Sequence, residues 1–203
     1  MAVATLTKES RVMDAQFIAQ LLQLTDATRI AANILIQTLE SCAQEMALDG
    51  PDVVAQHLRQ DKSASCARFC HGLTKQVAQA LGALDERVWA IYAPDDTLAD
   101  DVCFCGGTPS VPLVHLLIWR QWRTAAFDSL VAALDRALAQ VYKDKIGTQD
   151  LPILLDVHVM DDGSFEKHFG SVRSKRAFMR PVAYWLTQNE VVDIVYARGM
   201  MFP

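Results

Sequence analysis

Two histidines and two carboxylates gather where the last quarter of the chain is predicted to fold back on itself. The segments 153–160 and 164–169 have strand-like sequences, and the turn sequence Asp161-Asp162-Gly163 separates them. A three-residue loop with glycine in its third position keeps the apolar residues of both strands on one face. In that register the opposite face carries four polar residues: Asp156, His158, Glu166 and His168.

Three roles are open for this cluster. Residues opposed across two strands have Cβ atoms about 4.5–5.5 Å apart, which is close enough for two imidazoles and a carboxylate to bind Zn or Fe. Without a metal, Asp156 or Glu166 could orient a histidine that serves as a general base. The structural alternative is a solvent-exposed sheet face, where such cross-strand pairs add a little stability and nothing more.

A Cys-x-Cys string followed by two glycines forms a second candidate site. On an extended segment Cys103 and Cys105 would point to the same side, and the glycines would let the backbone fold around a bound ion. Metal binding, a redox thiol and simple packing are all open, because zinc sites usually have at least two residues between the thiolates. Nearby aspartates disfavour a thiolate. Cys66 and Cys70 fall on the apolar side of a predicted helix, and we expect them to be packed.

The charges of the chain are unevenly distributed. The net charge of −5 argues against a surface built for nucleic acid or anionic membrane. Residues 85–101 hold six acidic residues and one basic residue, so the net charge of this segment equals that of the whole chain. In a basic stretch over 166–180, Arg173, Lys175 and Arg176 could contact phosphate. The alternative is a solvated connector, since no Gly-rich phosphate loop accompanies these residues.

The apolar pattern predicts the elements that must position these residues. In the first part of the chain, helices are predicted at 10–48, 51–60 and 64–84, and the first could be one helix or two with a break near Asp26. A long helix is predicted from Ser110 to about 145, and Gly147 ends it. Its first part is apolar on nearly every side, so His115 is expected to be a packed histidine there.

The predicted strands lie in the second half of the chain. They cover 88–93, 153–160, 164–169, 182–186 and 191–197. The strand at 88–93, the long helix and the strand at 153–160 are expected to form a right-handed, parallel β–α–β unit, which two hairpins follow.

The length and composition fit one globular domain. The chain has 203 residues, 51% hydrophobic and 21% charged, so its core is large enough to fold without disulfides or metal. The predicted class is α+β. A helical layer over 1–84 is followed, over 85–203, by a mixed and largely antiparallel sheet with one long buried helix.

The sequence favours a soluble protein that binds a ligand or a partner, because no catalytic motif stands out. Residues 199–203 are apolar, which suggests docking on a second copy of the chain and hence a homodimer. Five cysteines, no export signal and no apolar stretch of membrane-spanning length predict a cytoplasmic protein with reduced thiols. A small molecule or a protein is the expected partner, and nucleic acid is not expected.

Two other functions are kept as alternatives. One is a metal-assisted hydrolase or oxygenase that uses the hairpin cluster, with Zn or Fe as its cofactor. The other is thiol or metal sensing through the Cys-x-Cys string.

Overall fold

The computed structural model of the chain describes residues 7–94, 113–147, 153–161 and 181–187, and within the first helix it describes side chains from Asp26 onward. The described residues form four helices and a four-stranded mixed sheet, which confirms the predicted α+β class. In chain order the elements are α1 (Thr7–Glu45), α2 (Pro51–Arg59), α3 (Ser63–Leu84), β1 (Val88–Pro94), β2 (Val114–Arg120), α4 (Ala125–Ile146), β3 (Leu155–Met160) and β4 (Pro181–Leu186).

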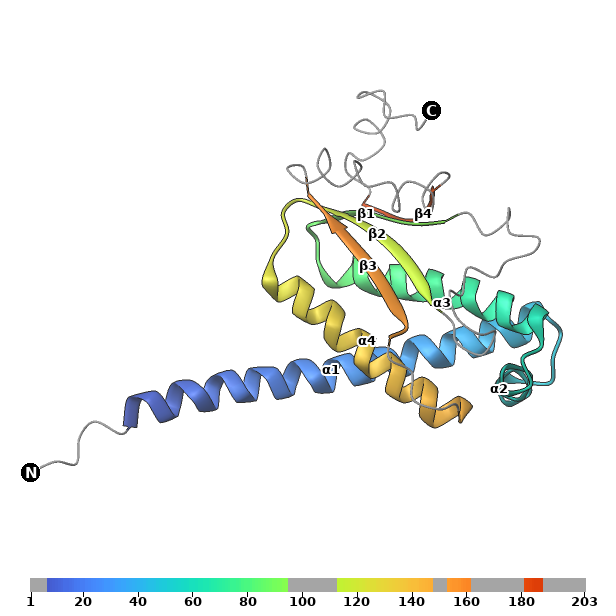
Figure 1. The fold of residues 1–203 in the computed structure, drawn as a ribbon, viewed down its shortest axis with the longest axis horizontal. Coiled ribbons are helices and arrows are strands. Elements are labelled where there is room, and N and C mark those ends of the chain that lie inside the picture. Colours follow the sequence, from blue (N-terminus) through green and yellow to red (C-terminus); the bar gives the residue numbers. More distant parts are fainter. Residues whose placement is uncertain (1–6, 95–112, 148–152, 162–180, 188–203) are drawn as a thin grey trace, which may run out of the picture.

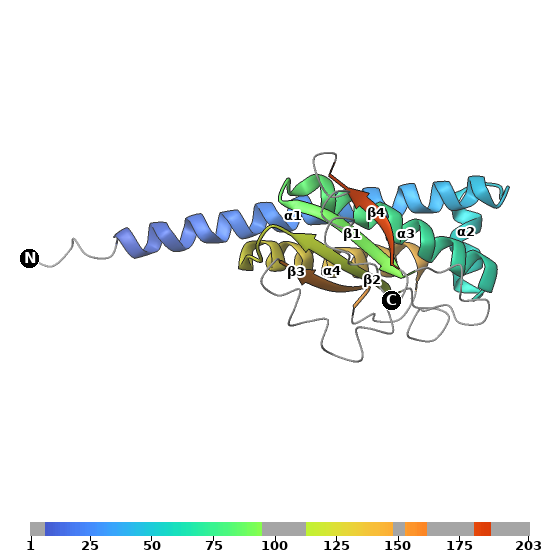
Figure 2. The same cartoon turned by 90° about the horizontal axis from the view of Figure 1, so that it is seen from above.

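The first helix, α1, is continuous, so the alternative of a break near Asp26 is wrong. Its N-terminal half extends beyond the rest of the described molecule (Figure 1, Figure 2), while its C-terminal half packs against α3 and α4. Ala27, Ala31, Ile34 and Thr38 are buried at helical spacing along this C-terminal half. The predicted helices 51–60 and 64–84 are both present.

The sheet has the strand order β3-β2-β1-β4. β1 is antiparallel to both β2 and β4, whereas β2 and β3 are parallel and are connected through α4. Figure 1 shows the labelled helices on one side of the sheet, with α3 and α4 beneath the strands and α1 beyond them. Because side chains alternate along a strand, β2 and β3 each have one face against the helices and one face directed away from them.

The largest difference from the predicted elements lies at 114–120, which forms β2 and not the first part of a long helix. A short apolar run that is buried on both faces has no clear period, so its sequence fits a buried strand as well as a buried helix. The helix begins at Ala125 instead. There the Thr124 side chain accepts a hydrogen bond from the backbone of Phe127, and Gly147, at a φ of +76°, ends the helix as predicted.

This difference changes the topology. The parallel β–α–β unit consists of β2, α4 and β3, so the prediction that 88–93 supplies its first strand is wrong. β1 lies between β2 and β4 and is antiparallel to both, so it belongs to no parallel pair. The predicted strands 164–169 and 191–197 lie outside the described residues.

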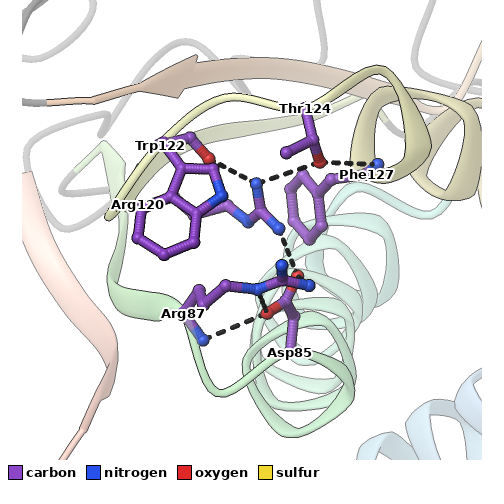
Figure 3. A network of polar contacts seen from close by, with 6 residues as sticks. All are labelled: Asp85, Arg87, Arg120, Trp122, Thr124 and Phe127. Carbon is purple, nitrogen blue, oxygen red and sulfur yellow. Dashed lines mark hydrogen bonds and ion pairs between the residues drawn. The ribbon is translucent and has the colours of Figure 1, made fainter.

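A buried arginine connects the ends of several elements (Figure 3). Arg120, the last residue of β2, is fully buried, and its Nη2 donates to Oδ2 of Asp85 at 2.5 Å. Its Nη1 donates to the carbonyl of Trp122 and to the hydroxyl of Thr124, and its guanidinium lies 4.5 Å from the ring centre of Phe127. The same side chain therefore contacts the end of α3, the β2–α4 connection and the first turn of α4.

Asp85 completes this network from the other side. It accepts hydrogen bonds from Nε and the backbone N of Arg87, at 2.8 and 3.0 Å, and from both arginine Nη2 atoms. Burial by itself would raise the pKa of Asp85, but the hydrogen bonds from Arg87 and Arg120 outweigh burial and hold the pKa at about 2. The carboxylate is therefore charged at neutral pH, as the buried guanidinium requires.

A close contact between α3 and β4 holds the edge of the sheet on the helices. The indole ring of Trp185 lies directly over Gly82, where a Cβ atom would come within 2.2 Å of the ring. Tyr184 adds a second contact, because its hydroxyl lies 3.1 Å from Nδ1 of His71 on α3. Only a residue without a side chain fits at position 82.

We expect Gly82→Ala to lower the free energy of unfolding by about 1–3 kcal/mol, even though alanine favours a helix, because the indole must move. Urea unfolding followed by tryptophan fluorescence measures this loss. Gly72→Ala on the same helix is the matched control, since its Cβ would lie 3.3 Å from the methyl group of Thr38. Equal losses in the two variants would contradict the proposed packing.

We expect Asp85→Asn to cost about 3–5 kcal/mol of stability near neutral pH, because it leaves the Arg120 guanidinium buried without a counter-charge. The folded pKa of Asp85 is depressed to about 2, so its stabilisation is present above the ordinary value of 3.8 and is lost as the pH falls through about 2. The stability difference between wild type and variant should therefore narrow over that range in urea titrations. A difference that does not change with pH would argue against the ion pair, and Asp26→Asn, in an exposed pair with Arg29, serves as the control.

Candidate functional site

The register of β2 and β3 places a histidine beside an aspartate. His115 and Asp156 are partners across the parallel pair, and Nδ1 of His115 lies 3.0 Å from Oδ2 of Asp156. His158 follows two residues later on the same face of β3, and its Nε2 lies 3.6 Å from Oδ1 of Asp156. We call these three residues the histidine cluster.

The cluster lies on the face of the sheet directed away from the helices. The residues next to the cluster in sequence, Val114, Leu116 and Val157, belong to or pack against the core between the sheet and the helices. Because side chains alternate along a strand, the three cluster residues face the other way. The side chains of His115, Asp156 and His158 are 21%, 41% and 48% exposed, respectively. All three side chains therefore contact solvent.

The contact with Asp156 indicates which ring nitrogen of His115 carries a hydrogen. A carboxylate oxygen only accepts, so Nδ1 of His115 carries the hydrogen and donates it to Asp156. In the neutral ring Nε2 then presents a lone pair. The cluster thus combines a carboxylate with two imidazole rings, which offer electron-pair donors.

Apolar and aromatic residues adjoin the cluster on the same face. Leu117 and Trp119 follow His115 at every second position of β2, and both are buried. Trp119 packs with Ala90 and Trp89 in a small cluster apart from the main core, and the rings of the two tryptophans are 6.2 Å apart. Burial raises the pKa of Tyr92, which packs against the same group. The polar end of this face is thus bordered by apolar side chains.

The structure places part of the predicted hairpin cluster. It brings Asp156 and His158 together and adds His115, while Glu166 and His168 lie outside the described residues. Within the described part of the chain, no three His, Cys, Asp or Glu side chains are arranged to hold a metal ion. The four-residue metal site therefore stays a prediction.

The other candidate sites also lie outside the described residues. They are Cys103 and Cys105, and the basic residues Arg173, Lys175 and Arg176. Their predicted roles stay open.

The contact between His115 and Asp156 was not predicted, because the segment with His115 was assigned to a helix. In a helix, the apolar residues nearest to His115 would lie one turn away from it. In the strand, His115 lies beside Asp156 of β3. Apart from His115, the run 114–119 is apolar at every position, so its sequence has no period that separates a strand from a helix.

Two further histidines have structural contacts. Nδ1 of His57 lies 3.0 Å from the hydroxyl of Ser65, which connects α2 to α3, and Ser65 is buried. His71 contacts Tyr184, as described above. Both partners are hydroxyl groups, so neither ring is oriented by a carboxylate in these contacts.

The described cysteines, Cys42, Cys66 and Cys70, form no disulfide. Cys66 is buried in the core, as predicted, and Cys70 is partly buried on the same helix. Cys42 is also buried in the core, and burial, with a smaller effect from Glu45, raises its pKa. Packing accounts for Cys42 and Cys66, and the raised pKa makes the Cys42 thiol a poor nucleophile.

Among the residues that the structure describes, no helix has both the length and the apolarity needed to cross a membrane. Comparisons with protein-family models, with curated proteins and with solved structures find no match to this chain. The histidine cluster must therefore be interpreted from its own chemistry.

Proposed function

We propose that this protein binds a small ligand at the histidine cluster. The observation that carries the proposal is the position of Asp156, whose two carboxylate oxygens are approached by two different imidazoles. Electron-pair donors on neighbouring strands favour an electron-deficient partner, namely a hydrogen-bond donor such as a phenol or an ammonium group.

Two properties of the surroundings support binding. The backbone of β2 and β3 is fixed by six successive residue pairs, from Val114 with Leu155 to Trp119 with Met160, so the three side chains project from a rigid support. Leu117 and its aromatic neighbours provide apolar surface beside the polar groups. A few polar groups among apolar ones is the usual composition of a small-molecule site.

The proposal also includes self-association and location. The apolar residues 199–203 favour a homodimer, and the odd number of cysteines, five, favours reduced thiols and hence the cytoplasm. Enzymatic use of the site, as a hydrolase or an oxygenase, remains the alternative function.

Ligand binding can be tested with a panel of small phenols, alcohols and alkylamines. In protein with ¹⁵N-labelled histidine, we expect at least one probe to shift the ring signals of His115 and His158 in NMR spectra. Asp156→Asn removes the charged acceptor and should weaken that binding roughly tenfold, since a hydrogen bond to a charged group is worth about 1.5–3 kcal/mol.

The signal of His71 in the same spectra is the internal control, because this ring contacts Tyr184 and lies on α3. Shifts of equal size at His71 and His115 would mean non-specific binding. The absence of any shift at His115 and His158 with the whole panel would contradict the proposed function.

Self-association has its own measurement. We expect light scattering of the full chain to give the mass of a dimer, and removal of residues 199–203 to lower the dimer fraction, because apolar contacts are lost. A monomeric mass at high protein concentration would refute the homodimer.

A further inference from the structure

We propose that the N-terminal half of α1 pairs, in antiparallel orientation, with the same half of α1 in a second copy of this chain. This inference does not depend on ligand binding at the histidine cluster. It rests on the homodimer of the proposed function and names the helix that forms its main contact.

The N-terminal half of α1 projects from the molecule. α1 is one continuous helix from Thr7 to Glu45, and its C-terminal half packs against α3 and α4. Figure 1 and Figure 2, which view the molecule in directions at right angles, both show the N-terminal half apart from the other labelled helices and strands. Residues 7–25 give roughly 28 Å of helix at 1.5 Å per residue. Because a helix in water gains most of its stability by packing an apolar side, a partner would stabilise this segment.

The apolar side that is buried in the C-terminal half of α1 continues along the N-terminal half. Ala31 and Leu35 are buried in the core. Steps of four or seven residues stay on one side of a helix, and such steps lead back from Ala31 to three large apolar residues. These are Leu24, Phe17 and Met13, which we call the α1 stripe.

The projecting segment carries almost no charge of its own. Residues 15–25 contain no charged residue, and Gln20, on the side of the α1 stripe, is polar but neutral. Four charged residues precede them, and their charges sum to zero: Lys8, Glu9, Arg11 and Asp14. A helix that lies on an anionic membrane is rich in Lys and Arg on its polar side, and a partner of nucleic acid carries an excess of positive charge. The neutral segment fits an apolar partner better than either of these.

A second copy of the chain offers a matching surface. Contacts about a two-fold axis bring the same surface of both copies together, so each α1 stripe meets an identical stripe. The antiparallel orientation also opposes the two helix dipoles and keeps the sheets of the two copies at opposite ends of the pair. If residues 15–25 form its centre, residues 8–14 of each copy lie beside the segment with Asp26 and Arg29 of the other. Both segments are neutral in sum, so no repulsion between like net charges opposes the pair.

The size of the paired segment suits a dimer. A standard interface uses about 20–30 residues from each partner, and residues 7–25 alone come close to this number. In the antiparallel pair the tip of each helix also reaches the region where α1 of the other copy packs against α4, which enlarges the contact. An apolar centre of this kind is typical of homodimer interfaces.

Sedimentation velocity of the full chain over a range of concentrations tests the pairing. Phe17→Glu places a charge on the α1 stripe and should raise the dissociation constant of the dimer at least about tenfold, because the charge is buried without a partner. Ala15→Glu is the matched control. It adds the same side chain to the same segment, but two residues away and hence on the opposite side of the helix, so the dissociation constant should stay unchanged.

Hydrogen exchange locates the contact. The backbone amides of residues 7–25 should be protected where the chain is dimeric, and should lose this protection on dilution and in Phe17→Glu. All four tryptophans lie outside α1, so urea unfolding followed by tryptophan fluorescence checks that the remainder of each variant is folded. Phe17→Ala replaces Phe17→Glu if the latter is not folded.

The outcomes separate this inference from the proposed homodimer. A dimer that survives Phe17→Glu but is lost when residues 199–203 are removed overturns the inference and leaves the homodimer intact. A chain that stays monomeric refutes both, while ligand binding at the histidine cluster keeps its own test. A monomer that floats with phosphatidylcholine or phosphatidylglycerol vesicles, and loses this binding in Phe17→Glu, assigns α1 to a membrane surface and also overturns the inference.

Discussion

Arg120 carries a positive charge into the interior at the end of β2, and the surrounding elements are arranged to neutralise it. Asp85 supplies the opposite charge from the end of α3, while the carbonyl of Trp122 and the hydroxyl of Thr124 accept hydrogen bonds from Nη1 of Arg120. A buried ion pair is not in itself a large source of stability, but it strongly penalises arrangements that leave one charge unpaired. The network therefore specifies where β2 ends relative to α3 and where α4 begins.

The position of β2 in turn determines the candidate site. β2 is central in the sheet, antiparallel to β1 and parallel to β3, and its register with β3 sets His115 opposite Asp156. On α4, Asp135 strengthens this arrangement, because its carboxylate accepts hydrogen bonds from the backbone of Leu154 and Leu155 at 2.8 and 2.9 Å. The start of β3 is thereby fixed to the helix that connects it to β2. The site depends on a chain of contacts that begins far from it.

The sequence contained enough information for the elements with a clear period or clear end signals. The helices at 51–60 and 64–84 and the end of α4 at Gly147 follow from apolar spacing and from glycine and proline positions. The segment 114–120 was misassigned because a strand buried on both faces loses its alternation, and partners distant in sequence decide its structure. The shared face of Asp156 and His158 was predictable from a two-residue period, whereas His115 required knowledge of strand pairing.

Asp85 and Asp156 differ in burial and in their partners, which is why we assign a structural role to the first and propose binding at the second. Asp85 is 9% exposed, receives hydrogen bonds from two guanidinium groups, and has a pKa of about 2, so no ligand could displace its partners without leaving Arg120 uncompensated. Asp156 is 41% exposed and has imidazoles as partners, which can be neutral and can exchange a hydrogen for another electron-deficient atom. Replacing the His115 hydrogen bond therefore leaves no buried charge behind. The cost of a buried, unpaired charge keeps the partners of Asp85 in place, whereas no such cost opposes a change of partner at Asp156.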